Sequence, residues 1–451
     1  YPNDLDAGTL YVARFNADGT GDRHTLNNSA TWLHAGAGSY GYIGDTGSAA
    51  VSIGQFQTRY GLPVEEEAFI DMNQMRYDVQ GILHAPVRFL ESIELRAGYT
   101  DYDHTEFEEP GVAGTVFDNK QSQVRLEAVH APIDGWRGVF GLQNDHREFS
   151  AEGEEAFVPS STTEGIGLFL MEQRTFDFGS IELGARVQRD KSEPDDGSSN
   201  EFTPISFSAG SVFNLSDAYH LKIYLTRAQR SPVAEELYAF GPHLATGTYE
   251  RGDDDLDVET ASNADVGLDY HGERLFWQIN VYYQRIEDYV YLTEVDQGLN
   301  ADGSGAVDVD GEADRVDEEG NFDPAGELLL VDYQQDDAEF YGYEAQASYQ
   351  LLTGPVALRA SMFTDKVIGQ LTNSTNLSRI PPARYGFGLD VSRGPLMGNI
   401  SYIHALSQNN LASLETPTKG YTMLTANVSY RLDVPGGSSA EIYLQGRNLS
   451  R

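Results

Sequence analysis

The chain has 451 residues, and its 70 acidic and 30 basic side chains give a formal net charge of −40 at neutral pH. Such a chain is a poor partner for nucleic acid, because binding to phosphate groups needs a basic surface. There is no cysteine, so a disulfide scaffold is excluded. The sequence also contains no run of eighteen apolar residues, so no transmembrane helix is expected.

Apolar and polar residues alternate strictly over many segments of the chain. A β-strand presents opposite faces with period two, so the apolar members of each segment belong to one face of a sheet. We count roughly eighteen such segments, each long enough to cross a bilayer at a tilt, which takes about 9–11 residues. In chain order, clear examples are Ile93, Leu95, Ala97 and Tyr99; Ile181, Leu183, Ala185 and Val187; Tyr341, Tyr343, Ala345, Ala347, Tyr349 and Leu351; Val356, Leu358, Ala360 and Met362; and Leu424, Ala426, Val428 and Tyr430.

A strand that is apolar on one face and polar on the other along its full length separates two solvents. The sequence therefore predicts an all-β fold, an antiparallel transmembrane β-barrel with lipid outside and a wet lumen inside. The 26 Tyr and 21 Phe fit aromatic girdles at the two membrane interfaces. The alternative is a large soluble β-sandwich or propeller, whose strands would be shorter and whose faces would be less cleanly divided.

The connections between these strands alternate between short turns and long loops, as in barrels that place turns in the periplasm and loops outside the cell. The expected long loops are Pro63 to Glu67, Glu106 to Val116, Ser150 to Glu164, Gln229 to Glu259, residues 296–339 and Leu406 to Gly420. Residues 296–339 contain many carboxylates and one basic residue, Arg315. A segment so polar is expected to bury no core, so we predict an acidic extracellular loop that is mobile or binds cations.

Both chain ends suggest a mature or truncated piece. The sequence starts without an initiator Met or a signal segment, although an outer-membrane barrel must be exported. The last alternating segment, Ile442 to Asn448, stops just before Arg451, and a closed barrel cannot leave an unpaired strand edge in lipid. We therefore expect residues 1–451 to be one barrel domain, truncated at both ends.

Three sequence motifs follow one another along the chain. They are Arg-Ser-Pro-Val-Ala-Glu-Glu-Leu-Tyr at residues 230–238, Asp253-Asp-Asp-Leu256 followed by Glu259, Asn263 and Asp265-Val-Gly267, and Gly446-Arg-Asn-Leu449 near the end. Together they resemble the barrel motifs of TonB-dependent outer-membrane receptors. The resemblance implies a 22-stranded barrel when complete, a plug domain that is missing here, and coupling through that plug to the TonB–ExbB–ExbD complex. It also implies a transporter, not an enzyme, in the outer membrane of a Gram-negative cell.

Further segments resemble the zinc-importing subgroup of these receptors. They are Phe240-Gly-Pro-His-Leu-Ala-Thr-Gly-Thr-Tyr-Glu250, Tyr60-Gly-Leu-Pro63, Gly153-Glu-Glu-Ala-Phe-Val-Pro159 and Ile380-Pro-Pro-Ala-Arg-Tyr385. The chain departs from the zinc receptors at one point, because those receptors often carry a His-rich tract after the segment that corresponds to Tyr60-Gly-Leu-Pro63. This chain has Glu65, Glu66 and Glu67 there, and carboxylates suit calcium, magnesium or manganese as readily as zinc. The implied substrate is zinc or a related divalent cation.

The candidate metal ligands lie in these segments. His243 follows a Gly-Pro pair, and a neutral imidazole is a good ligand for zinc. The other candidates are loop glutamates that could converge over the barrel mouth: Glu66, Glu67, Glu154, Glu155 and Glu250. The plainer interpretation of His243 is a rigid turn residue that hydrogen-bonds a neighbouring loop. The remaining histidines, including His220 and His271 at expected turns, form no tight metal-binding spacing and individually favour lumen or interface positions.

No catalytic site is expected, because the sequence has no nucleophile elbow, no phosphate-binding loop with lysine and no cysteine cluster. Three other functions remain compatible with the pattern. A receptor for haem, a siderophore or another metal chelate shares the fold, a passive porin would lack the plug, and a soluble calcium-binding adhesin would not enter the membrane.

Overall fold

The computed structural model describes residues 28–62, 67–153, 156–243, 246–413, 415–434 and 438–450. These residues form one 22-stranded sheet and a five-residue helix, α1 (Ala234–Tyr238). In the described part of the chain, no helix has the length and apolar character needed to cross a membrane. The predicted all-β fold is confirmed.

Eighteen of the described strands have between 9 and 25 residues, which matches the number of alternating segments in the sequence. They are β1 (Thr31–Gly44), β2 (Gly47–Gly61), β3 (Phe69–His84), β4 (Leu90–Glu109), β5 (Val112–His130), β6 (Trp136–Gly153), β7 (Ser161–Phe176), β8 (Gly179–Pro194), β10 (Ile205–Asn214), β11 (Tyr219–Arg230), β14 (Glu259–His271), β15 (Leu275–Glu294), β17 (Leu328–Leu352), β18 (Ala357–Leu371), β19 (Arg384–Arg393), β20 (Leu396–Ala405), β21 (Tyr421–Val434) and β22 (Ser438–Gly446). The four short strands are β9 (Asn200–Phe202), β12 (Phe240–His243), β13 (Thr248–Arg251) and β16 (Arg315–Val316).

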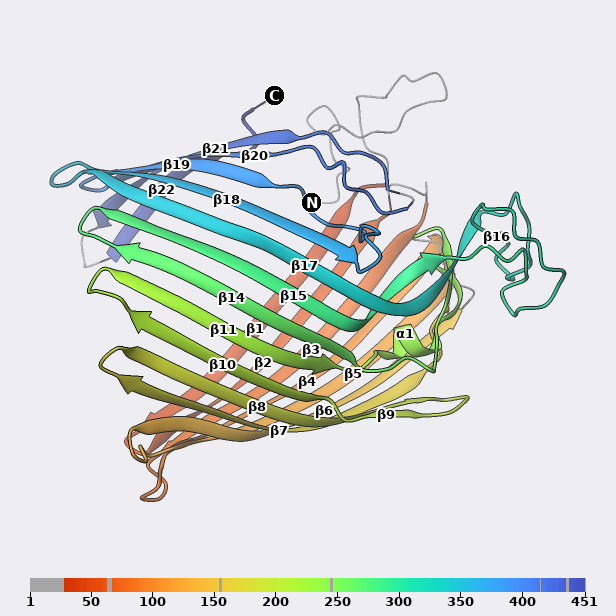
Figure 1. Ribbon diagram of the computed structural model, residues 1–451, viewed down its shortest axis with the longest axis horizontal. Coiled ribbons are helices and arrows are strands. Elements are labelled where there is room, and N and C mark those ends of the chain that lie inside the picture. The colour runs from red at the N-terminus through yellow and green to blue at the C-terminus, as the bar shows by residue number, and fades with distance from the viewer. Residues whose placement is uncertain are drawn as a thin grey trace.

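The long strands form an antiparallel meander. Each pairs with the next long strand along the chain, and β8 pairs with β10, β11 with β14, and β15 with β17. The short strands therefore belong to the connections and not to the wall. Figure 1 shows the sheet curling, so that β1 to β5 lie behind the strands from β8 to β15. Such a sheet has the curvature of a barrel wall.

Short turns gather at one end of the sheet, whereas α1 and β16 lie at the other (Figure 1). The turn between β7 and β8 needs Gly179, because a Cβ there would lie 1.8 Å from the carbonyl oxygen of Val212. At the opposite end the structure corrects one expected loop, Glu106 to Val116. Strands β4 and β5 continue through that segment to a tight turn at Pro110 and Gly111, and their pairing continues past irregularities on either side of Phe107.

The two faces of the wall carry different side chains. Leu183 of β8 is 44% exposed on one face. On the other face, Arg186 and Asp190 of the same strand border a hollow of about 370 Å³ that also contacts Pro232. Polar side chains from each long strand between β5 and β11 converge on this hollow, as side chains do on the concave side of a curved sheet. The polar face therefore lines the interior, and the apolar face is left for lipid.

The acidic segment differs from its prediction in two ways. Its last part, from Leu328 onward, is the beginning of β17, so the connection from β15 ends at Glu327. That connection also has a small core, in which Val316 is fully buried and packs with Leu330 and Tyr249. The sequence analysis did not predict this core, because it relied on the many carboxylates and on two-residue alternation. The four consecutive buried residues at the start of β17 break that alternation.

Candidate metal site

The connection from β11 to β14 carries α1, β12 and β13, and an ionic network fixes its two ends. The guanidinium of Arg230 donates to Glu236 of α1, at 2.8 Å from Nη1 to Oε2, and also to Glu259 at the start of β14. Leu237 of α1 is buried in one hydrophobic cluster with Leu256. This motif, which the sequence analysis singled out, thus holds the connection over one end of the wall.

Strands β12 (Phe240–His243) and β13 (Thr248–Arg251) pair as an antiparallel hairpin, with His243 opposite Thr248. Phe157, from the connection between β6 and β7, lies against this hairpin and accepts a 2.7 Å backbone hydrogen bond from Phe240. Gly241 allows that approach, because a Cβ at this position would lie 3.0 Å from the Cα of Phe157. The hairpin therefore contacts the connection between β6 and β7 through β12, and it pairs in parallel with the beginning of β17 through β13.

The imidazole ring of His243 is held by a contact on its face and by another at its Nδ1 atom. The ring of Phe157 stacks on the imidazole, with 4.4 Å between ring centroids. The Nδ1 atom of His243 lies 2.8 Å from Oε1 of Glu250, whose side chain is 5% exposed. Thr248 and Tyr333 donate to the same carboxylate at 3.1 and 3.2 Å. Predicted ligands His243 and Glu250 are thus brought together.

The electrostatics of this pair determine which nitrogen of His243 is free. Burial would raise the pKa of Glu250, but the hydrogen bonds from His243, Thr248 and Tyr333 outweigh burial and hold that pKa below its ordinary value. An ionised carboxylate only accepts hydrogen bonds, so Nδ1 of His243 carries a proton. In the neutral form of this imidazole the lone pair is then on Nε2, and that atom has no hydrogen-bond partner among the described residues.

The other predicted ligands are not assembled around His243. Glu67 is exposed at the end of the connection between β2 and β3, while Glu66, Glu154 and Glu155 lie outside the described residues. In the described ranges, two groups of three carboxylate or imidazole ligands have atoms within 4.8 Å of one another, and neither includes His243.

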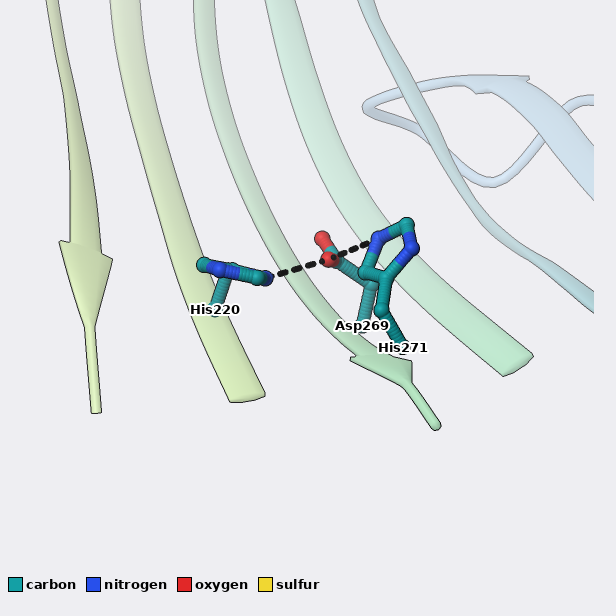
Figure 2. Close-up of side chains that lie close together, drawn as sticks. All are labelled: His220, Asp269 and His271. Atoms are coloured by element: carbon teal, nitrogen blue, oxygen red, sulfur yellow. Dashed lines mark hydrogen bonds and ion pairs between the residues drawn. The ribbon is translucent and has the colours of Figure 1, made fainter. Parts of the chain in front are cut away.

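One of those groups is a cluster that sequence reasoning missed. His220, Asp269 and His271 come together at the far end of the wall (Figure 2). The sequence analysis placed both histidines in turns and treated each alone, whereas the structure places them on β11 and β14. The pairing of β11 with β14 was the missing signal, because it sets His220 opposite Asp269. The three residues of the second group, Asp253 to Asp255, are exposed.

Comparison with known proteins gives a match to one family over nearly the whole chain. The sequence model of the TonB-dependent-receptor-like β-barrel family matches residues 2–449.

Solved structures agree on the fold. The copper transporter OprC has a TM-score of 0.73 at 18% identity, over 95% of this chain and 65% of its own. The FrpB iron transporter from Neisseria meningitidis (F5-1 variant) also has a TM-score of 0.73, at 14% identity, over 98% and 71% of the two chains. A mutant of the ferric enterobactin receptor PfeA from Pseudomonas aeruginosa reaches 0.69 at 15% identity, over 99% and 68%. The chain therefore spans about two thirds of the length of these proteins, and just under that for the copper transporter.

Proposed function

The chain belongs to the TonB-dependent receptor β-barrel family, and from that premise we propose that it forms the wall of an outer-membrane receptor that imports zinc or a related divalent cation. In this proposal lipid surrounds the apolar face in the outer membrane of a Gram-negative cell. The short turns face the periplasm, and the connection that carries His243 faces outward. A plug domain would couple the barrel to the TonB–ExbB–ExbD complex, as the sequence resemblance implies.

The observation that carries the cation class is the fixed imidazole of His243. Its Nδ1 is bonded to Glu250 and its ring is stacked on Phe157, while its Nε2 lone pair is free to bind a metal ion. Histidines that bind metals usually donate their other ring N–H to a carboxylate or carbonyl, which sets the tautomer and makes the ligand nitrogen more basic. Glu250 fits that supporting position.

We assign Glu250 to positioning His243 and not to direct contact with the cation. Both of its oxygens already accept hydrogen bonds from protein groups. The glutamates near Phe157 in sequence, Glu154 and Glu155, together with Glu66 and Glu67, remain the proposed source of oxygen ligands. One imidazole with one or two carboxylates would hold zinc less tightly than a closed four-ligand site, as release during transport requires.

Zinc titration of the purified full-length receptor tests this proposal. We expect His243→Ala to weaken zinc binding by at least about tenfold, because losing a ligand costs no less than losing a supporting group. Glu250→Gln should weaken it less, since the amide oxygen of Gln can still accept from Nδ1. His404→Ala is the matched control, because His404 bonds a hydroxyl group of Thr422 at 2.8 Å on the barrel wall.

Two outcomes would contradict the proposal. Unchanged zinc affinity in folded His243→Ala, together with unchanged growth under zinc limitation, would return His243 to a structural part of the hairpin. Spectroscopic titration with haem that gives tight binding, in a receptor that does not bind zinc, would instead favour the receptor for an organic chelate.

A further inference from the structure

A second cluster of metal-binding side chains lies at the turn-bearing end of the wall, opposite the end that carries His243. His220 is the second residue of β11, and Asp269 and His271 are at the end of β14. His220 and Asp269 are cross-strand partners, and His271 follows Asp269 by two residues on the same face. All three side chains therefore project from one face of two neighbouring strands (Figure 2).

That face is the one that lines the interior. Tyr219 and Tyr270 alternate with His220 and Asp269 along the two strands, so they project from the opposite face. There they meet each other with 4.7 Å between ring centroids, and Trp277 packs beside them. An aromatic group at a strand end is typical of the membrane interface. The histidine cluster thus lies at the periplasmic rim of the lumen, and the aromatic group lies on the opposite face of the same strands.

Asp269 holds the two imidazoles together. Its side chain is 3% exposed, and its Oδ2 atom lies 3.1 Å from Nδ1 of His220 and 2.9 Å from Nε2 of His271. Its Oδ1 atom lies 2.6 Å from the Nζ atom of Lys222. The ammonium group of Lys222 therefore balances the carboxylate charge at one oxygen and leaves the other between the histidines.

We propose that His220, Asp269 and His271 form a second divalent-cation site, of the zinc class, at this rim. Two imidazoles and one carboxylate are a ligand set of open zinc sites, in which a fourth position is left for water or for exchange. A neutral imidazole carries one proton, which can reside on the nitrogen that points away from the cluster. Each inward nitrogen then offers a lone pair, and the cation replaces the two hydrogen bonds that now end on Oδ2.

The surroundings suit reversible binding. His271 is 54% exposed, so a cation reaches the cluster directly from the lumen. Lys222 adds a positive charge beside the carboxylate, and repulsion by that charge makes the cation easier to release. If the proposed cation import holds, this cluster is the place where a cation pauses before it leaves the barrel, but its binding of zinc does not depend on His243.

The test measures zinc binding to the full-length receptor that carries His243→Ala, so that the outer candidate ligand is removed. We expect one reversible zinc site to remain, with cobalt giving visible absorption bands when it replaces zinc. Adding His271→Ala should weaken zinc at least about tenfold and remove the cobalt bands. His220→Gln serves as a second variant that keeps a polar side chain on β11.

His130→Ala is the matched control. His130 also lies at the turn-bearing end and also bonds a carboxylate, with 2.9 Å between its Nε2 atom and Oε1 of Glu172. No described histidine joins them in a group of three candidate ligands. We expect this substitution to leave zinc binding unchanged. Equal zinc affinity with and without His271 and His220, in barrels shown to be folded, would overturn the proposal and leave the cluster as an ionic clip between β11 and β14. Because only binding is measured, a failure of zinc import through His243 would not affect this result.

Discussion

A buried carboxylate that accepts three hydrogen bonds is stabilised in its charged form, and Glu250 is such a group. Its pKa is lowered in the folded protein, so protonation must break favourable contacts with His243, Thr248 and Tyr333. The stability that these contacts give to the β12–β13 hairpin is complete at pH values above the ordinary 4.5 of a glutamate. It is lost as the pH falls through the lowered pKa of the folded state.

We therefore predict a local acid transition that depends on Glu250. Above pH 4.5, hydrogen exchange of the hairpin amides should be slower in the parent protein than in Glu250→Gln, compared at each pH. The difference should shrink below pH 4.5 and vanish once the pH is below the lowered pKa of folded Glu250, because both side chains are then neutral. A difference that persists undiminished in strong acid would show that the charge of Glu250 does not stabilise the hairpin.

Residue pairs differ in how far sequence could predict them. His243 and Glu250 are seven residues apart in one segment, and both were predicted as members of one site, although the hydrogen bond between them was not. The cluster of His220 with Asp269 and His271 was missed, because 49 residues separate His220 from Asp269 in the sequence. Finding it required knowledge that the intervening connection, 231–258, leaves the wall and lets β11 pair with β14.

At the scale of elements, the pairing of β15 with β17 and the folding of the connection between them depend on different contacts. The two long strands pair from Leu275 opposite Tyr349 up to Glu294 opposite Val331, without help from the acidic connection. Val316, in contrast, covers Leu330 and the beginning of β17. Acidic composition could predict the solvated part of this connection, but not the buried apolar contacts that fold it back.

We predict that deleting residues 302–321 leaves the barrel folded, because wall pairing is independent of this segment. The full-length variant should keep the heat-modifiable gel mobility of a folded barrel. Amides of Leu328 to Val331 should exchange faster, because they lose the cover of Val316. The matched variant Val316→Asp, which keeps the loop length, should loosen the same amides. Loss of heat-modifiable mobility in the deletion would show that the acidic connection is needed for the wall.

For the whole molecule, period-two alternation was sufficient to predict the architecture. It identified about eighteen crossing strands and the antiparallel order, because an apolar face and a polar face are needed on every strand that separates lipid from water. It could not predict the short strands β9, β12, β13 and β16. Those strands pair with one another or with the ends of β8 and β17, and two of them, β12 and β13, carry His243 and Glu250 of the outer candidate site.

The assignment of faces predicts opposite responses at neighbouring positions of β8. Leu183 projects toward lipid, so Leu183→Arg should destabilise the full-length barrel by roughly 2–4 kcal/mol if the residue lies near the bilayer midplane. Glu182 projects into the wet lumen, so Glu182→Arg on the same strand should change the free energy of unfolding little. Denaturant titration of both variants in lipid vesicles measures the difference. A large loss for Glu182→Arg with none for Leu183→Arg would invert the two faces, and it would move His220, Asp269 and His271 out of the lumen as well.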